Sequence, residues 1–162
     1  MSAEQWVQFK SPKELERVVK LLGDIVGGMI SCGDVHVRVD RKSKTSLRIS
    51  YQARFYRREL ALLVTRELSR RFAVTRIGAD AVGWYPDKDW TRYEDELVHD
   101  YGQQYKSWPE WIRNWKPEFS KREFGRAMPR LLEQIQILDS QVVELFDNLE
   151  KANELPNSVS VR

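Results

Sequence analysis

The alternation of hydrophobic and polar positions predicts a strand, a helix and a second strand in the first forty residues. Residues 6–10 alternate as a short strand, with Gln8 on its polar face. A helix should follow, because Ser11 is an N-cap residue placed directly before a proline, and Gly23 should end it. Residues 29–40 then alternate with period two, which predicts one continuous strand.

A basic turn and a second helix come next in the pattern. Residues 41–45 form the turn, and residues 47–52 alternate as the return strand of a hairpin. Residues 57–72 repeat at helical spacing and residues 73–77 read as a short strand. The predicted order is β-α-β-β-α-β, the ferredoxin-like arrangement with two helices on one face of an antiparallel sheet.

The rest of the chain is predicted to be helical. Residues 87–106 form one helix, and residues 129–154 form a long one in which hydrophobic residues recur at alternating steps of four and three. This heptad seam begins before the helix, and its nine positions are Phe124, Met128, Leu131, Ile135, Leu138, Val142, Leu145, Leu149 and Ala152. The fold class is therefore α+β, with a small domain at 1–85, a helical region packed on it at 86–154 and a disordered tail at 155–162.

Composition places the protein among intracellular globular proteins. Hydrophobic residues make up 41% of the chain and charged residues 31%, and no apolar run is long enough to cross a membrane. The single cysteine, Cys32, cannot form an internal disulfide, which agrees with a reducing compartment. We therefore expect a cytoplasmic protein with no membrane partner.

Charge is distributed unevenly along the chain. Residues 1–80 carry 16 Lys and Arg against 9 Asp and Glu, whereas residues 81–162 carry 11 against 15. The excess is concentrated between Arg38 and Arg76, where a convergent basic surface would attract nucleic acid or an acidic protein surface. The candidate nucleic-acid-binding residues are Arg38, Arg41, Lys42, Lys44, Arg48, Arg58, Arg66 and Arg70.

A helix-turn-helix is an alternative interpretation of residues 68–82. Ser69, Ala73 and Thr75 have suitable positions for its first helix, its turn and the cap of its second helix. Gly78 would then lie inside the recognition helix, where glycine costs about 1 kcal/mol relative to alanine. The same residues also read as a helix followed by a strand.

Catalytic and metal-binding patterns are weak. On one continuous strand, Cys32 and His36 would lie about 13 Å apart, too far for a thiolate and its base. Glu96 and His99 have the spacing of a helical metal-ligand pair, but a second pair is missing from the sequence. We expect no catalytic residue, no metal and no cofactor.

Three tryptophans gather in the segment 107–119. Trp108, Trp111 and Trp115 would share one face of a helix that is too short to persist alone, so the face must be covered. We expect this cover to come mainly from the same chain, with a partner protein as the alternative. The candidate partner-binding residues are Trp108, Trp111, Trp115, Leu138, Val142 and Leu145.

These observations predict a non-enzymatic binding protein. It would engage nucleic acid or another polyanion through the basic hairpin and the 57–71 helix, and its C-terminal helices would assemble with a second copy or a helical protein partner. The alternative is a protein-protein interaction adaptor or assembly factor with no nucleic-acid role.

Overall fold

The computed structural model describes residues 2–52, 56–80, 108–114 and 128–160. The predicted helix at 87–106 and Trp115 lie outside these residues. No helix in the described ranges is long and apolar enough to cross a membrane.

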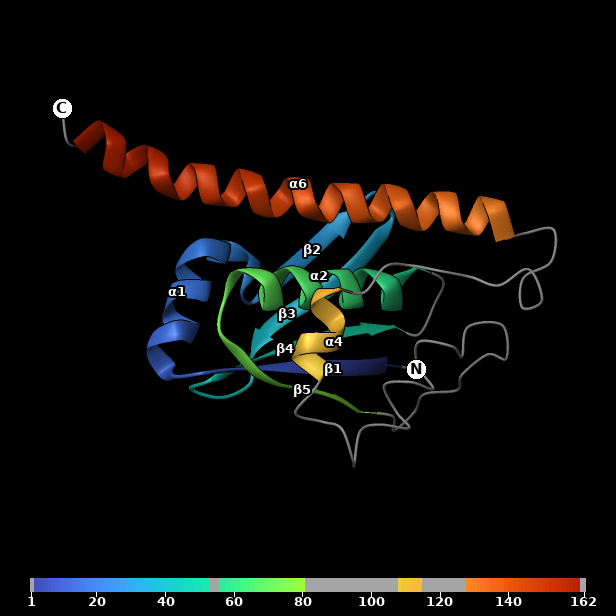
Figure 1. The fold of residues 1–162 in the computed structure, drawn as a ribbon, viewed down its shortest axis with the longest axis horizontal. Helices are drawn as coiled ribbons and strands as arrows, with labels where there is room; N and C mark the ends of the chain where they lie inside the picture. The colour runs from blue at the N-terminus through green and yellow to red at the C-terminus, as the bar shows by residue number, and fades with distance from the viewer. Residues whose placement is uncertain (1, 53–55, 81–107, 115–127, 161–162) are drawn as a thin grey trace.

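The fold is α+β, built on an antiparallel five-stranded sheet with the order β2-β3-β4-β1-β5 (Figure 1). Strand β1 lies between β4 and β5 and pairs with both, so the first strand of the chain is central. The strands are β1 (Ser2–Phe9), β2 (Gly28–Cys32), β3 (Val35–Arg41), β4 (Ser46–Gln52) and β5 (Val74–Asp80).

The prediction of one strand over residues 29–40 is wrong. The chain reverses at Gly33, and β2 pairs with β3 as a tight hairpin in which Cys32 lies opposite Val35. Gly33 has φ of +61°, a conformation that suits glycine at the first position of a two-residue hairpin loop. The observed order is therefore β-α-β-β-β-α-β, with one more strand than predicted.

Helix α1 begins as its sequence predicts. The side chain of Ser11 accepts a hydrogen bond from the backbone N–H of Glu14, and Pro12 occupies the first helical position. Helix α1 spans Pro12–Leu22 and leads into a short 3-10 turn, η1 (Gly23–Ile25).

Helix α2 (Arg57–Arg71) is buried along most of its length. All residues from Arg58 to Ser69 are buried, including both charged and apolar positions. The helix contacts β3 and β4 on one side, and α4 (Trp108–Arg113) and α6 (Met128–Ser160) on the others. A buried hydrogen bond from the hydroxyl of Thr65 to the side chain of Gln5 also ties it to β1.

The main core lies between the sheet and these helices. It is continuous from α1 through the sheet to α2, and α6 adds its own apolar side chains to it. Fully buried members include Val7, Phe9, Leu15, Val39, Leu47, Ile49, Leu60, Leu63, Leu68, Val142 and Phe146.

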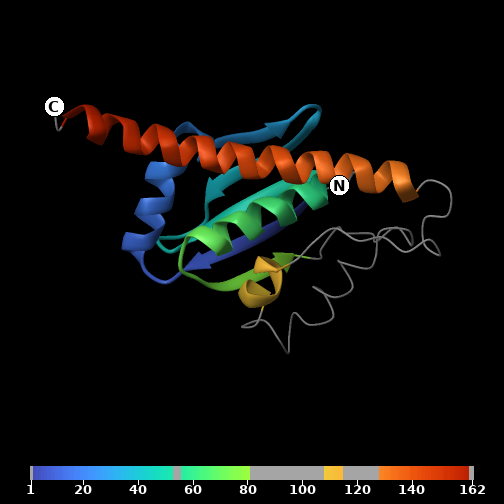
Figure 2. The same cartoon turned by 45° about the horizontal axis from the view of Figure 1, so that its top comes forward.

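The long helix α6 lies across α2 and over one end of α1 (Figure 2). It is 33 residues long, about 50 Å at ~1.5 Å per residue. Pro129 is its second residue, where a missing N–H costs nothing. The helix continues to Ser160, past the predicted end at residue 154, so residues 155–160 differ from the predicted disordered tail.

The buried face of α6 follows the predicted heptad only in part, because Leu145 and Leu149 pack against the core while Phe146, which lies off the heptad, is fully buried. Ile135, Leu138 and Val142 are buried, but the next fully buried residue is Phe146, one position beyond the predicted Leu145. A straight helix drifts by ~20° per heptad relative to a strict seven-residue repeat, so the centre of its buried face moves gradually away from the predicted positions. Ala152, the last predicted position, is exposed.

This packing changes the role of two candidate partner-binding residues. Leu138 and Val142 are buried inside their own chain, and Leu145 packs against the same core. The prediction that they meet a partner is therefore wrong for Leu138 and Val142. Ordinary amphipathic packing of α6 on α2 accounts for them.

The helix-turn-helix alternative is also wrong. Residues 74–80 form β5, which pairs antiparallel with β1 from Glu4 to Phe9. Helix α2 ends at Arg71 and no second helix follows it before residue 81.

Replacing Phe146 with Ala should lower the free energy of unfolding by about 3–5 kcal/mol, because it removes a fully buried ring from the α2–α6 contact. Ile137→Ala is the matched control: Ile137 is on the same helix, is 45% exposed, and should change stability by no more than about 0.5 kcal/mol. Urea unfolding followed by circular dichroism measures both. Equal effects of the two substitutions would contradict this packing of α6.

Candidate nucleic-acid interface

Among the described residues, α1 and α2 cover one face of the sheet, and we call the other face the open face. In Figure 1 α2 lies in front of the sheet, so the open face points away from the viewer. Strand alternation and cross-strand register place these residues on it: Glu4, Trp6 and Gln8 of β1, Met29 and Ser31 of β2, His36, Arg38 and Asp40 of β3, Arg48 and Ser50 of β4, and Arg76 and Gly78 of β5.

Two predicted arginines of the open face are tied to carboxylates. The Nε atom of Arg38 lies 2.9 Å from an oxygen of Asp40. The guanidinium of Arg48 lies 4.0 Å from Asp40 and 3.9 Å from Glu4. All these contacts are at least partly exposed, so each contributes about 0–1 kcal/mol and leaves the arginines able to meet another anion.

Three cations on or beside the open face have no carboxylate partner among the described residues. Lys42 and Lys44 lie in the β3–β4 turn and Arg76 lies on β5, and all three are exposed. The turn is shaped by hydrogen bonds from the backbone N–H groups of Lys42 and Ser43 to the carbonyl oxygen of Ser46. This hairpin and the neighbouring strands therefore present positive charge that carboxylates of the described ranges do not neutralise.

Trp6 lies near the middle of β1, on the open face. It is opposite Arg48 on β4 and opposite Gly78 on β5. A Cβ atom at Gly78 would lie 2.2 Å from two carbon atoms of the indole, so the ring occupies space that only glycine leaves free. The ammonium of Lys42 lies 3.8 Å from the centre of the Trp6 ring, in a cation–π contact.

Arg41, also a predicted site residue, points toward the helices. Its guanidinium donates a hydrogen bond of 2.7 Å to Glu16 of α1. This contact lowers the pKa of the Glu16 carboxyl and raises the pKa of Arg41. Arg41 therefore closes the turn against α1 and does not face the open side of the sheet.

The predicted nucleic-acid contact of the 57–71 helix is wrong for Arg58 and Arg66. Both side chains are buried, and Arg66 is only 2% exposed. Arg70 is exposed, but its Nε atom donates a 2.7 Å hydrogen bond to the backbone carbonyl oxygen of Arg113 in α4. The helix pattern could not show this, because α6 and α4 cover the second side of α2.

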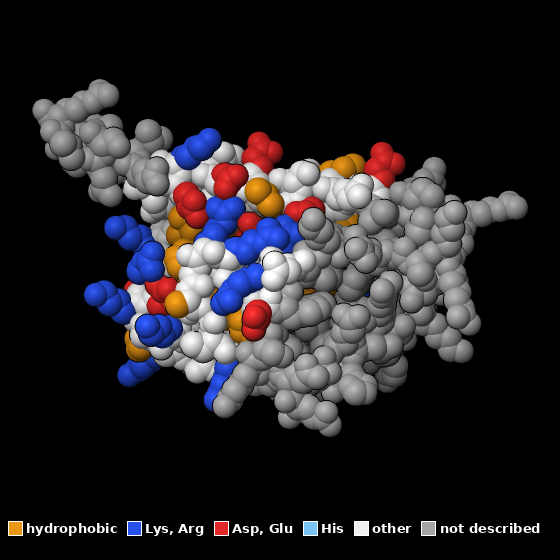
Figure 3. Space-filling view, in the orientation of Figure 1, with side chains coloured by type: hydrophobic (Ala, Val, Ile, Leu, Met, Phe, Trp, Pro, Cys, Tyr) orange, Lys and Arg blue, Asp and Glu red, His pale blue; other side chains and the backbone are white. Residues whose placement is uncertain are grey.

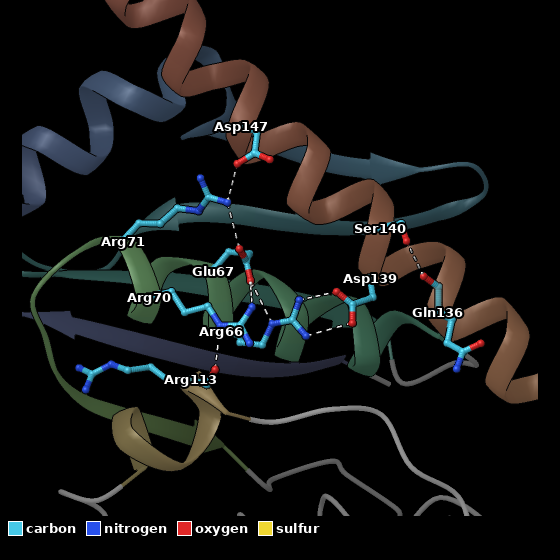
Figure 4. A network of polar contacts seen from close by, with 9 residues as sticks. All are labelled: Arg66, Glu67, Arg70, Arg71, Arg113, Gln136, Asp139, Ser140 and Asp147. Carbon is cyan, nitrogen blue, oxygen red and sulfur yellow. Dashed lines mark hydrogen bonds and ion pairs between the residues drawn. The ribbon is translucent and has the colours of Figure 1, made fainter.

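Arg66, Arg70 and Arg71 of α2 belong to a network of ion pairs that reaches α6 (Figure 4). Glu67 accepts hydrogen bonds from Arg66 at 3.0 Å, and from Arg70 and Arg71 at 3.1 Å each. Arg66 also makes a two-pronged contact with Asp139 of α6. Burial alone would lower the pKa of Arg66, but its contacts with Asp139 and Glu67 raise that pKa overall, so its charge is kept.

A second arginine extends this network along α6. Arg71 contacts Asp147 at 3.0 Å and Glu150 at 2.9 Å, and its guanidinium lies 5.4 Å from the centre of the Phe146 ring. Viewed from the helix side, Lys and Arg side chains alternate with Asp and Glu side chains over α2 and α6 (Figure 3). The arginines of this network are neutralised internally, whereas Lys42, Lys44 and Arg76 of the open side have no carboxylate partner in the described ranges.

The tryptophan segment is described only in part. Residues 108–113 form α4, which contacts α2 and β5, and Pro109 and Ile112 are buried. The side chains of Trp108 and Trp111 lie outside the described part of the structure, as does Trp115. The prediction that the indoles are covered by the same chain stays a prediction.

The hairpin also changes the geometry around Cys32 and His36. His36 lies opposite Ser31, and the Nδ1 atom of His36 is 2.7 Å from the hydroxyl oxygen of Ser31 on the open face. Cys32 faces the core, where burial raises the pKa of its thiol. The two side chains therefore point to opposite faces of the sheet. This orientation separates them, whereas the sequence pattern predicted that distance along one strand would do so.

The described residues offer no metal site. They contain no group of three or more His, Cys, Asp or Glu side chains that could hold a metal ion, and the predicted pair Glu96 and His99 lies outside them. A cleft of about 360 Å³ lies between α1, the end of α2 and α6. Two of its cations are already engaged, Arg71 by carboxylates and Arg17 by Glu14 and the Phe72 ring.

Comparisons of the chain with protein-family models, with curated proteins and with solved structures found no significant match. The candidate site therefore depends on the geometry and chemistry of this chain alone.

Sequence reasoning missed two residues of the open face. Trp6 precedes the apolar positions Val7 and Phe9, and the alternation that placed Gln8 on the polar face also places Trp6 there. Arg76 follows from the same alternation in β5, opposite Gln8. Strand alternation thus predicts both residues, whereas the clustering of charge along the chain points only to the turn and the helix.

Glu59 is the most perturbed carboxyl group among the described residues. It lies in the first turn of α2, is 1% exposed, and its burial raises its pKa to about 7. The charge of Arg58 and the backbone N–H groups of Glu59 and Tyr56 act in the opposite direction but do not overcome burial. Between about pH 4.5 and about pH 7, the folded protein therefore holds a proton on Glu59 that the unfolded chain releases.

Replacing Glu67 with Gln should lower the free energy of unfolding by about 3 kcal/mol, because it removes the buried carboxylate that three arginines share. Glu150→Gln is the matched control, since it removes an exposed partner of Arg71 and should cost no more than about 1 kcal/mol. Urea unfolding of both variants at neutral pH makes the comparison. A Glu67→Gln protein as stable as the control would contradict a stabilising role for the network.

Replacing Glu59 with Gln should stabilise the protein at pH 8 and have little effect at pH 5. A raised folded-state pKa means that stability falls as pH rises from about 4.5 to about 7, by about 3 kcal/mol in all, and the amide avoids this loss. Glu16→Gln, in which an exposed carboxyl with a lowered pKa is removed, should show the opposite sign and a small effect. Urea unfolding between pH 5 and pH 8 tests this, and equal stability differences at both ends would refute it.

Proposed function

We propose that this protein binds nucleic acid through the open face of its sheet and the basic β3–β4 turn. The observation that carries the proposal is the set of exposed cations without carboxylate partners in the described ranges, Lys42, Lys44 and Arg76, around an aromatic ring on the same surface. The protein would act by binding and not by catalysis.

The charge balance of the surface supports this proposal. Five cationic side chains, Arg38, Lys42, Lys44, Arg48 and Arg76, lie on the open face or its turn, and the carboxylates of Glu4 and Asp40 lie among them. Each phosphate that replaces a counterion on such a surface adds affinity through counterion release. The arginines paired with Asp40 and Glu4 can exchange an exposed carboxylate for a phosphate at little cost.

The surface differs from the one that charge clustering alone predicts. Helix α2 is unsuited to ligand binding because Arg58 and Arg66 are buried and Arg70 joins α2 to α4. Arg76 and Trp6 take its place. The proposed binding surface is therefore formed by strands, and α2 supports it from behind.

The alternative of a protein-protein adaptor has less support. It depends mainly on an unpartnered seam of the long helix, and the described part of that seam is largely buried against α2 and the core. The tryptophan face remains open to this alternative, since the indoles lie outside the described side chains.

We also propose that the sheet and its two helices are a ferredoxin-like core with one strand added. Without β2, the remaining strand order is β3-β4-β1-β5. Strands β1 and β3 then lie on either side of β4, and β4 and β5 lie on either side of β1, as in a split βαβ unit. Strand β2 then extends the edge beside β3.

Replacing Lys42, Lys44 and Arg76 together with Ala should weaken binding to oligonucleotides and reduce the salt dependence of binding. The logarithm of the association constant falls with the logarithm of salt concentration in proportion to the phosphates neutralised. The slope should therefore fall by about one for each phosphate that the variant no longer neutralises. Filter binding across a salt series measures both quantities.

The matched control is the triple variant Lys13→Ala, Lys20→Ala and Lys151→Ala, which removes the same charge from exposed positions on the helices. The salt dependence of its binding should stay close to that of the wild type, apart from a small effect of the changed net charge. Equal reductions in the two triple variants would show that binding follows net charge and not the open face, and an absence of salt-dependent binding by the wild type would refute the proposal.

A further inference from the structure

Strand β2 is an edge of the sheet, and its outer side pairs with no strand among the described residues. Helix α6 contacts β2, and in Figure 2 β2, in light blue, is seen beyond α6 at the upper margin of the ribbon. Solvent reaches this strand, since Met29 is 54% exposed and Ser31 is also exposed. The outer side of β2 is therefore open to a further strand.

The hairpin register decides which backbone groups of β2 face outward. Cys32 and Val35 flank the two-residue loop and so form a hydrogen-bonded pair. Hydrogen-bonded pairs alternate along an antiparallel ladder, so Ile30 also bonds to β3, and the backbone groups of Met29 and Ser31 point away from β3. The outer side of β2 thus presents two N–H donors and two carbonyl acceptors.

The sequence of β2 does not protect this edge. Natural edge strands commonly carry charged side chains or proline, which discourage pairing with another chain. The stretch 26–33 contains neither, whereas β5, at the other end of the sheet, includes Arg76 and Asp80. An uncharged edge with exposed donors and acceptors is suited to strand addition.

A second copy of β2 fits this edge in an antiparallel register centred on Ile30. Met29 then lies opposite Ser31 of the second copy, and the outward groups of the two strands make four hydrogen bonds. At each end Gly27 lies opposite Gly33, where no side chain obstructs the approach of the strands. The same residues serve on both copies, as a two-fold axis requires.

We propose that this protein forms a two-fold dimer in which the β2 strands of two copies pair antiparallel and join the two sheets. This inference is independent of the proposed function. Positions 29 and 31 lie on the open face, so the open faces of the two copies become one continuous surface. The paired strands are only five residues long, and the interface falls below the ~1,200 Å² of standard complexes, which makes the dimer reversible.

Sedimentation over a concentration series tests the dimer, in high salt that screens attraction between charged surfaces. The wild-type protein should pass from monomer to dimer as its concentration rises. Met29→Lys places one charge per copy at the edge and should raise the dissociation constant of the dimer by at least about tenfold. Thr75→Lys is the matched control, because it adds the same charge at an exposed position of β5 and should leave the dissociation constant unchanged.

Disulfide cross-linking tests the register, in a Cys32→Ala background that removes the native thiol. A mixture of Met29→Cys and Ser31→Cys proteins should form a mixed disulfide, because directly opposite positions lie ~5.5 Å apart between Cα atoms. Each protein alone brings together only diagonal positions and should cross-link several-fold less. Thr75→Cys, on the opposite edge strand, measures cross-linking by random collision. Thermal unfolding shows that each variant is folded.

The outcomes distinguish this inference from the proposed function. A wild-type protein that stays monomeric throughout the series would overturn the dimer and leave the edge to a strand of another protein. A dimer of Met29→Lys as tight as the wild-type dimer would also overturn it, since the contact would then lie elsewhere. Equal cross-linking of the mixture and of the single proteins would refute the register. Salt-dependent oligonucleotide binding by a purely monomeric protein would leave the proposed function standing while this inference fails.

Discussion

The carboxylate of Glu67 organises the contact between α2 and the helices that cover it. It is buried and accepts hydrogen bonds from Arg66, Arg70 and Arg71, and two of these arginines continue to carboxylates of α6. A guanidinium can enter a protein interior only when its charge is paired and its donors are satisfied, and this network pairs the charges. The seating of α6 across α2, and with it the burial of α2 on both sides, depends on these pairs together with the apolar contacts of Phe146 and its neighbours.

Burial of α2 divides the basic residues of the chain into two groups. On the helix side, arginines of α2 form ion pairs with carboxylates of α6, and these pairs hold the two helices together. On the other side of the sheet, Lys42, Lys44 and Arg76 meet no such carboxylates among the described residues. The acidic helix α6 packs on α1 and α2, on the opposite side of the sheet. The basic residues of the first half of the sequence therefore form two separate groups in the fold. The group on the open face is the better placed to meet an external anion.

The open face also depends on a small residue. Trp6 can lie against the sheet because Gly78 has no side chain, and the register of β1 against β5 brings the two residues together. Residues far apart in the chain thus build one feature. A similar dependence on pairing explains the hairpin at Gly33, where an alternating segment that resembles one long strand folds back on itself.

Local pattern in the sequence determined the α+β class, the capped helix α1, the basic turn and the strand β4 that follows it. These features follow from spacing within a few residues, where the backbone responds to period, caps and turn residues. Tertiary structure alone decided which arginines are buried, which residues flank Trp6, and whether the hydrophobic face of α6 meets its own chain. Those outcomes require partners distant in sequence: Arg66 is internal because Asp139 lies against it, and Leu138 is core because α2 lies beneath it. A periodic pattern shows which side of an element seeks cover, and only the folded chain shows what covers it.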